Sequence, residues 1–302
     1  MNAKQTSLTA TLIAAATVMC EHDLERPPPV GAAPWCARFL RTTRQGRWLL
    51  ASARLTAFRK CWGTLEHFAL LGIVAHCMYR KRTIDRLTRM AAGEGFTQLV
   101  VLGAGFDSLA FRMHSEGTFA QVISADHPAT LSTVKTALST VSDPAGGDAE
   151  SSTPDIELLA IDLMSDDVQT VLSQTAAFDP HRATLFVIEG VLMYLPESEV
   201  ARLLQALAEL PCEHSRLIAS WMQAANGLPI GFRGQSGLIN RMLSLSNEKM
   251  LWGSTPEKLP STLAEWGWSC SQIIDLGRHD PESPAPSIGL PSEQLVVATG
   301  RP

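Results

Sequence analysis

Residues 98–102 (QLVVL) and the turn Gly103-Ala104-Gly105 that follows them decide the fold of this chain. The five residues form a short apolar run that begins shortly after Gly95. A strand that is buried on both faces has this pattern, because its apolar residues do not alternate with polar ones. Glycine lets the backbone turn sharply and come close to a ligand. The stretch therefore predicts a buried β-strand that ends in a ligand-binding turn.

Apolar runs and helix-like stretches alternate along the rest of the chain. The runs that predict strands are 122–123, 156–161, 184–188, 216–219, 271–276 and 294–299, and the helix-like stretches include 129–141, 168–175, 197–210 and 259–268. Such alternation is typical of a doubly wound parallel sheet. The last two runs are joined by a Pro- and Ser-rich loop with no crossover helix, so we expect them to pair antiparallel. The prediction is a Rossmann-like α/β fold, with a mostly parallel seven-stranded sheet that ends in an antiparallel hairpin.

The N-terminal part of the chain has helical rather than strand-like spacing. Residues 8–20 form an apolar stretch that is too short to span a bilayer and continues into charged residues, which disfavours a cleaved signal. Prolines at 27–29 break this helix, and a helical pattern then runs from about 35 to 90. We predict a helical cap over 1–78 and a Rossmann-like domain over 79–302, with a substrate-side insert at about 223–262.

Composition narrows the range of functions and locations. Of 302 residues, 45% are hydrophobic, which is enough for a large core. The formal net charge of −5 disfavours nucleic acid as a partner. The six cysteines have no zinc-binding spacing, so we expect no metal and thiols in a reducing compartment. The predicted location is the cytoplasm, with no membrane partner, and the sequence leaves the oligomeric state open.

Three acidic residues follow successive predicted strands. Asp126, Asp162 and Glu189 stand where the carboxyl ends of parallel strands meet, which is where open α/β sheets bind ligands. Asp126 lies 21 residues beyond Gly105, a spacing at which a carboxylate can bind ribose hydroxyls. A dinucleotide site would need a third glycine at position 108, but Ser108 stands there. The pattern favours a nucleoside ligand without a pyrophosphate.

The motifs in this region resemble the leucine carboxyl methyltransferase family, which includes bacterial polyketide O-methyltransferases. The resemblance is carried in order by 79–85 (YRKRTID), 101–108 (VLGAGFDS) with Arg112, 125–128 (ADHP), 162–163 (DL), 178–180 (FDP) and 189–196 (EGVLMYLP). It covers about 75–222. Position 124 is Ser where the family has Glu, and the signatures expected soon after the opening helix are absent.

The resemblance implies S-adenosyl-L-methionine as the cofactor and assigns site residues to it. Arg80 would bind the carboxylate of the methionine part, although Arg82 lies close enough for the two roles to be exchanged. The other implied contacts are Gly103, Ala104 and Gly105 beneath the cofactor, Asp126 at the ribose, Asp162 with Leu163 at the adenine, and Glu189 at the methionine end.

The predicted reaction is methyl transfer from S-adenosylmethionine to a carboxylate or hydroxyl oxygen of a small molecule, in specialised metabolism. A carboxylate acceptor needs no general base, whereas a hydroxyl needs one. His67, His76 and Tyr194 are candidates, and no catalytic residue is assigned. Arg233 in the insert is a candidate to receive an acceptor carboxylate. The alternatives are N- or S-methylation of a small metabolite, an NAD(P)-binding oxidoreductase, or a non-catalytic binding module.

Overall fold

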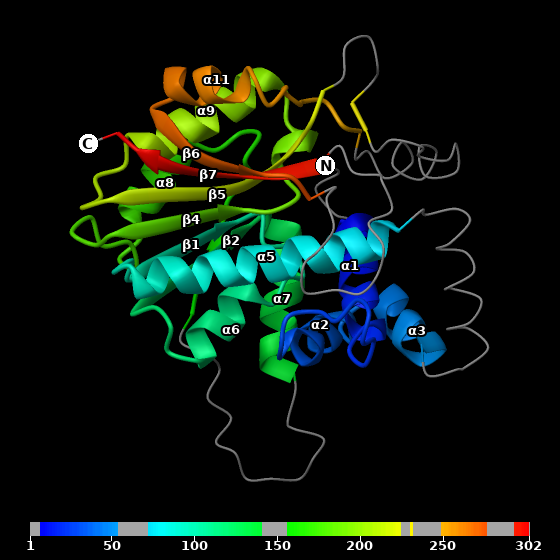
Figure 1. Ribbon diagram of the computed structural model, residues 1–302. Helices are drawn as coiled ribbons and strands as arrows, with labels where there is room; N and C mark the ends of the chain where they lie inside the picture. Colours follow the sequence, from blue (N-terminus) through cyan, green and yellow to red (C-terminus); the bar gives the residue numbers. More distant parts are fainter. Residues whose placement is uncertain are drawn as a thin grey trace.

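The computed structural model describes residues 7–53, 72–140, 156–224, 230–231, 249–276 and 293–301. Within these ranges the chain forms one seven-stranded sheet with helices on both faces (Figure 1). The predicted loop at 141–154 and most of the predicted insert lie outside the described residues.

The strand order of the sheet is β3-β2-β1-β4-β5-β7-β6. The first five strands of the chain pair parallel, and β7 then enters between β5 and β6, antiparallel to both. This confirms the predicted mostly parallel sheet that ends in an antiparallel hairpin. The strands are β1 (Gln98–Leu102), β2 (Gln121–Asp126), β3 (Glu157–Ala160), β4 (Thr184–Ile188), β5 (Ser215–Met222), β6 (Trp268–Ile274) and β7 (Glu293–Gly300).

Successive residues of the central strands face two separate cores. In β1, Leu99 and Val101 pack into the core on one face, while Val100 and Leu102 pack into the core on the other. Side chains alternate across a strand, so a sheet covered on both faces buries every residue. All five residues of β1 are buried, as the uninterrupted apolar run predicts.

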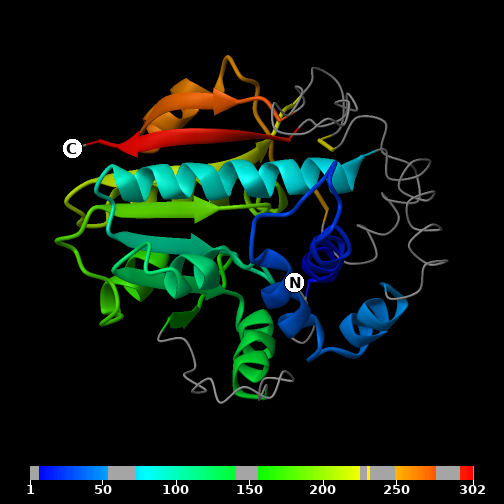
Figure 2. The same cartoon turned by 60° about the horizontal axis from the view of Figure 1, so that its bottom comes forward.

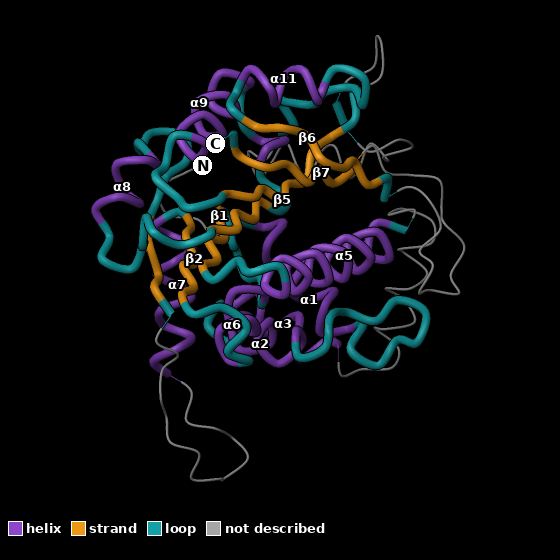
Figure 3. Tube along the Cα trace, turned by 60° about the vertical axis from the view of Figure 1, so that its left-hand side comes forward, coloured by secondary structure: helices purple, strands orange, loops and turns teal. Residues whose placement is uncertain are grey.

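The helices form two layers that enclose the sheet (Figure 3). One layer contains α1 (Leu8–Met19), α2 (Ala32–Leu40), α3 (Arg44–Ala53), α5 (Ile73–Gly93), α6 (Leu109–Ser115) and α7 (Pro128–Thr140). The other contains α8 (Val168–Gln174), the 3-10 turn η2 (Leu192–Tyr194), α9 (Glu197–Ala208) and α11 (Leu259–Glu265). In Figure 2 the arrows of β1 and β4 point toward the blue helices α1 and α2, while β7 points the opposite way.

The N-terminal helices are fastened to the Rossmann-like layers by both apolar and polar contacts. Phe39 of α2 is fully buried, with its ring centroid 5.0 Å from that of Phe111 in α6. The Arg38 guanidinium donates to the carbonyls of Ala137 and Leu138, at 3.0 and 2.8 Å, near the end of α7. Cations at a helix C-terminus satisfy its unpaired carbonyls and interact favourably with its dipole. The division of the chain at residue 78 stays a prediction, and α5 runs through that position.

The C-terminal helix and strand differ from the sequence prediction in their boundaries. The expected helix over 259–268 ends at Glu265, because Gly267 takes a left-handed conformation with φ 87°. Strand β6 begins directly after this turn with Trp268, whose indole is fully buried and donates to the Leu204 carbonyl at 2.8 Å. The strand therefore starts at Trp268 rather than at the predicted residue 271.

None of the described helices is both long and apolar enough to cross a membrane.

Candidate active site

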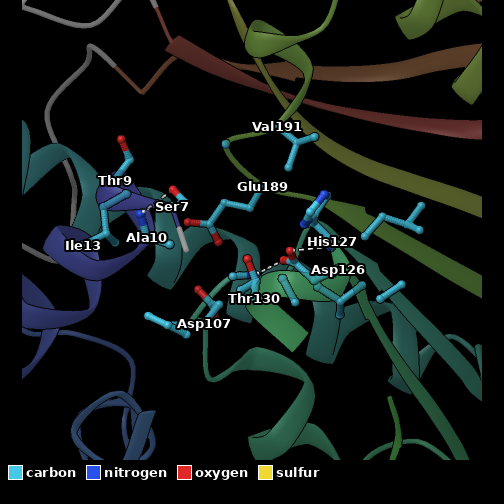
Figure 4. Close-up of a pocket in the computed structure, with 18 of the residues that line it drawn as sticks. Ser7, Thr9, Ala10, Ile13, Asp107, Asp126, His127, Thr130, Glu189 and Val191 are labelled. Carbon is cyan, nitrogen blue, oxygen red and sulfur yellow. Dashed lines mark hydrogen bonds between the residues drawn. The ribbon is translucent and has the colours of Figure 1, made fainter. Parts of the chain in front are cut away.

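A cavity of about 390 Å³ lies at the carboxyl ends of the parallel strands (Figure 4). Its walls come from the loops after β1, β2, β3 and β4, from α5, and from the N-terminal helix α1. All eight residues predicted to bind the cofactor line this one cavity: Arg80, Gly103, Ala104, Gly105, Asp126, Asp162, Leu163 and Glu189. The structure thus brings together residues that are up to 109 positions apart in sequence.

Both glycines of the turn after β1 have left-handed backbone angles, and each lies close to a different neighbour. Gly103 has φ 69°, and a Cβ added there would overlap the Cγ2 of Val191. Gly105 has φ 57°, and its Cβ would lie 3.2 Å from the Cβ of Ala10 in α1. Residues with a Cβ rarely adopt such backbone angles. The turn can therefore approach both Val191 and α1 only because side chains are missing there.

Asp126 holds the glycine turn in place from the end of β2. Its carboxylate accepts hydrogen bonds from the backbone N–H of Gly105 and, at 2.6 Å, from that of His127. The hydroxyl of Thr130 also donates to it (Figure 4). Burial raises the pKa of Asp126, and these hydrogen bonds oppose the rise only in part. Asp126 is thus a desolvated acceptor that faces the cavity and stabilises its floor.

Asp162 and Leu163 form the cavity wall after β3. The Asp162 Oδ1 atom accepts from the backbone N–H of Met164 at 3.0 Å, and the Asp162 N–H donates to Asp166 at 2.8 Å. The Nε2 atom of His127 lies 3.7 Å from Asp162 Oδ2. The carboxylate is thus oriented by its own loop, next to the partly buried side chain of Leu163.

The opposite end of the cavity carries buried cations and carboxylates in alternation. Arg80 donates from Nε to Glu189 Oε1 at 3.0 Å, and its Nη2 lies 2.9 Å from the same oxygen. Lys81 lies between two carboxylates, contacting Asp107 and also Glu189 at 3.1 Å. Arg80 and Lys81 are 4% and 8% exposed, so their charges are almost fully removed from water.

The neighbouring carboxylates raise the pKa values of the two buried cations in this cluster. Burial lowers the pKa of Arg80, but Glu293 and Glu189 raise it well above its usual value. Burial likewise lowers the pKa of Lys81, and Asp107 and Glu189 together raise it above its usual range. Arg80 and Lys81 therefore stay protonated at neutral pH despite their burial. Buried charges are tolerated only when paired in this way.

The structure separates the two arginines that the sequence left as alternatives. Arg80 faces the cavity, whereas Arg82 points to the other side of α5 and donates to the backbone carbonyl of Pro27. Asp85, one turn further along α5, pairs with Arg112, whose Nε donates to Ser108 Oγ at 3.1 Å. Ser108, where a dinucleotide site would have glycine, thus helps to join the glycine turn to α5.

Helix α1 closes the cavity on the side away from the sheet. The Ser7 hydroxyl caps the helix by accepting from the Ala10 N–H at 3.0 Å. The lining residues of α1 and its N-cap are uncharged and include small and hydroxyl-bearing side chains: Ser7, Thr9, Ala10, Ile13, Ala14 and Thr17. Through these residues the N-terminal helix forms part of the cavity wall.

Of the candidate bases, only Tyr194 lines the cavity among the described residues. His76 lies on α5 and forms a 2.7 Å hydrogen bond with Glu293 instead. His67 and Arg233 lie outside the described residues.

Sequence reasoning did not assign four charged or polar residues that the structure places at or behind the site. Lys81 and Asp107 fall inside the motifs that carry the family resemblance, so their position there was a usable signal. His127 directly follows Asp126, and this position next to a predicted site residue was a usable signal. Glu293 lies 213 residues from Arg80, and nothing in the sequence links the two.

Comparison with known proteins gives a family match and related chains. Residues 10–208 match the family model described as leucine carboxyl methyltransferase. A protein from Streptomyces coelicolor, provisionally named an S-adenosyl-L-methionine-dependent methyltransferase, is 30% identical over 203 residues, which are 67% of this chain and 65% of that protein. A protein of the same provisional name from Mycobacteroides abscessus is 26% identical over 281 residues, 88% of this chain and 84% of that protein.

The match does not extend over the whole of every relative. The chain spans about two thirds of the length of the Streptomyces coelicolor relative, and 60% of a relative from Streptomyces avermitilis. A crystal structure from Thermobifida fusca is similar in fold, with a TM-score of 0.57 at 18% identity, covering 93% of this chain and 97% of that one. That likeness supports the fold.

Proposed function

Because this chain belongs to the leucine carboxyl methyltransferase family, we propose that it transfers the methyl group of S-adenosylmethionine to an oxygen of a small molecule, either a carboxylate or a hydroxyl. The match confirms the predicted family, and the names of the relatives agree with the predicted enzyme class and cofactor. The proposal includes an oxygen atom as the methyl acceptor, a role in specialised metabolism, and the cytoplasm as the location.

One observation carries the choice of ligand: the two ends of the cavity differ in charge. The Asp126 and Asp162 end offers hydrogen-bond acceptors, as ribose hydroxyls and an adenine amino group require. The other end places Arg80 and Lys81 beside Glu189 and Asp107. A zwitterionic amino acid needs both signs of charge within reach. A nucleoside joined to an amino acid, as in S-adenosylmethionine, matches both ends.

When bound, S-adenosylmethionine supplies a methyl group already activated by its sulfonium. The protein then has to orient the acceptor and exclude water, and orientation can contribute about 7–11 kcal/mol to such a reaction. Helix α1 covers the cavity and serves to exclude water. An acceptor carboxylate is ionised at neutral pH and reacts without a base. For an acceptor hydroxyl, Tyr194 is the described residue placed to take part, and we assign no catalytic role.

The competing functions are separated by direct tests. An oxidoreductase would bind NAD(P), and a non-catalytic module would bind S-adenosylmethionine without turnover. For an enzyme, incubation with methyl-labelled S-adenosylmethionine and candidate acceptors, followed by mild alkali, distinguishes the products. Alkali releases methanol from methyl esters, but not from methyl ethers, N-methyl or S-methyl groups. Calorimetric titration with S-adenosylhomocysteine comes first, and no binding by folded protein would overturn the proposed function.

Conservative replacement of the two arginines should separate their roles. Lysine keeps the charge but loses the two-pronged geometry of the guanidinium. We expect Arg80→Lys to weaken S-adenosylhomocysteine binding by about tenfold, as the loss of one charge-assisted hydrogen bond would. Arg82→Lys, which changes a side chain outside the cavity, should leave the dissociation constant within about twofold. Calorimetry measures both, and equal effects of the two variants would contradict the assignment of Arg80.

The raised pKa of Asp126 predicts that binding weakens in acid. A carboxylate accepts hydrogen bonds from both ribose hydroxyls, and protonation removes part of that capacity. Burial places the pKa of Asp126 above its ordinary 3.8, so affinity should fall as the pH decreases toward that raised value. Titrations between about pH 8 and about pH 5 test this. The Asp126→Asn variant is the control, and its weaker binding should lack this component of the pH dependence.

A further inference from the structure

Glu293 is a buried carboxylate on the last strand of the sheet, and it lies outside the 10–208 match to the family model. It is the first residue of β7 and is 0% exposed. It does not line the described cavity, so it does not contact a ligand bound there. Among the described residues, the hydrogen-bond partners of its side chain are on α5, a helix that is distant in sequence and lies beside the sheet.

The Arg80 guanidinium lies between Glu293 and Glu189. Its Nη1 atom donates to Oε1 and Oε2 of Glu293, at 2.7 and 2.6 Å. Its Nε and Nη2 atoms lie 3.0 and 2.9 Å from Glu189, the carboxylate that lines the cavity. Bonds from two sides fix the plane of a guanidinium, whose donors form a rigid fork. Glu189 and Glu293 together therefore fix the orientation of the Arg80 guanidinium.

His76 is the second residue of α5 that contacts the Glu293 carboxylate. The two residues of α5 are four positions apart, so they lie on the same face of the helix. The Nε2 atom of His76 lies 2.7 Å from Glu293 Oε2, the oxygen that Arg80 also contacts. Burial raises the pKa of Glu293, but the charge of Arg80 and the hydrogen bond with His76 lower it to about 2. Glu293 is thus an anion with a fixed orientation throughout the neutral range.

We propose that Glu293 is a positioning residue for the cofactor: acting through Arg80, it orients the guanidinium that binds the carboxylate of the methionine part. The inference rests on the proposed function, because it needs S-adenosylmethionine in the cavity. A buried ion pair is weak evidence for stability, since an apolar pair of similar volume often serves as well. A role in orienting Arg80 explains why ionised groups lie behind the methionine end of the cavity.

The test compares two ligands that differ in the group that Arg80 would bind. S-adenosylhomocysteine carries the amino acid part, with the carboxylate that Arg80 would bind and an ammonium group, and 5′-methylthioadenosine has the same nucleoside with neither. We expect Glu293→Gln to weaken S-adenosylhomocysteine binding by about tenfold, because the amide loses the charge that orients Arg80. Binding of 5′-methylthioadenosine should remain within about twofold. In an Arg80→Lys background, Glu293→Gln should cause little further loss, since both changes act on the same contact.

Two further variants keep the test decisive. Glu293→Asp retains the charge but draws it back from Arg80, so it should show a smaller loss that is again selective for S-adenosylhomocysteine. Glu265→Gln, at an exposed position on α11, is the matched control and should affect neither ligand. Equal weakening of both ligands by folded Glu293 variants, or no weakening of either, would overturn this inference alone. Failure of the wild-type protein to bind S-adenosylhomocysteine would overturn the proposed function and the inference with it.

Discussion

Asp126→Ala is expected to weaken binding of both S-adenosylhomocysteine and 5′-methylthioadenosine by at least about 100-fold. Each hydrogen bond to a charged group contributes about 1.5–3 kcal/mol, and the carboxylate would accept two from the ribose. The same side chain also holds the Gly105 N–H and the His127 N–H, so its loss loosens the floor of the cavity. Both ligands carry the ribose, so both should be affected. Calorimetric titration measures the two dissociation constants.

Two control variants make this expectation specific. Asp126→Asn keeps the size of the side chain and should bind more tightly than the alanine variant but more weakly than the wild type. Asp179 lies in the loop before β4, at the amino ends of the parallel strands and away from the cavity, so Asp179→Ala should bind both ligands normally. If Asp126→Ala folds and still binds within about threefold of the wild type, then the ribose does not lie at the end of β2.

Gly103→Ala should be the most damaging single methyl group that can be added near the cavity. An alanine at φ 69° costs about 1–3 kcal/mol in backbone strain. Its Cβ would also overlap Val191 Cγ2, and inserting a methyl group into a packed site costs about 1–3 kcal/mol more. We therefore expect the free energy of unfolding to fall by about 2–6 kcal/mol. Denaturation in urea, followed by circular dichroism, measures this change.

A second substitution separates the two causes of that loss. Val191→Ala removes the Cγ2 atom that blocks the new methyl group, but leaves the backbone angle as it is. Gly103→Ala should therefore lower the free energy of unfolding by less in the Val191→Ala background than in the wild-type protein. An equal loss in both backgrounds would show that backbone strain accounts for the whole effect. A change below about 0.5 kcal/mol in the single variant would contradict the described geometry.

The central strands could be predicted closely because burial on both faces leaves an uninterrupted apolar run. The predicted ranges 98–102 and 184–188 coincide with β1 and β4. The predicted helix over 259–268 includes Trp268 wrongly, because the apolar spacing continues beyond the end of α11. The sequence does not reveal that Gly267 adopts a left-handed turn there. Helix α6 is not among the predicted helices, because the five consecutive residues 109–113 are all buried and leave no polar face from which a helical period could be read.

The candidate site could be predicted where the topology brings strand ends together. Asp126, Asp162 and Glu189 follow strands that run parallel, so their meeting at one edge follows from the strand order. The position of Glu293 near the site could not be predicted in this way. It begins an antiparallel strand, and its contact with Arg80 depends on which sheet neighbour β7 chooses. The ligand roles of the lining residues remain predictions.

The direction of β7 determines at which end of the chain an anchor can be joined for binding measurements. This strand begins beside Arg80, near the cavity, and ends at Gly300, which pairs with Trp268 at the far edge of the sheet. Ser7, in contrast, lies in the cavity wall itself. A tag or sensor anchor joined beyond the end of β7 therefore lies away from the cavity. The same anchor placed ahead of residue 7 would stand next to it and should slow ligand exchange.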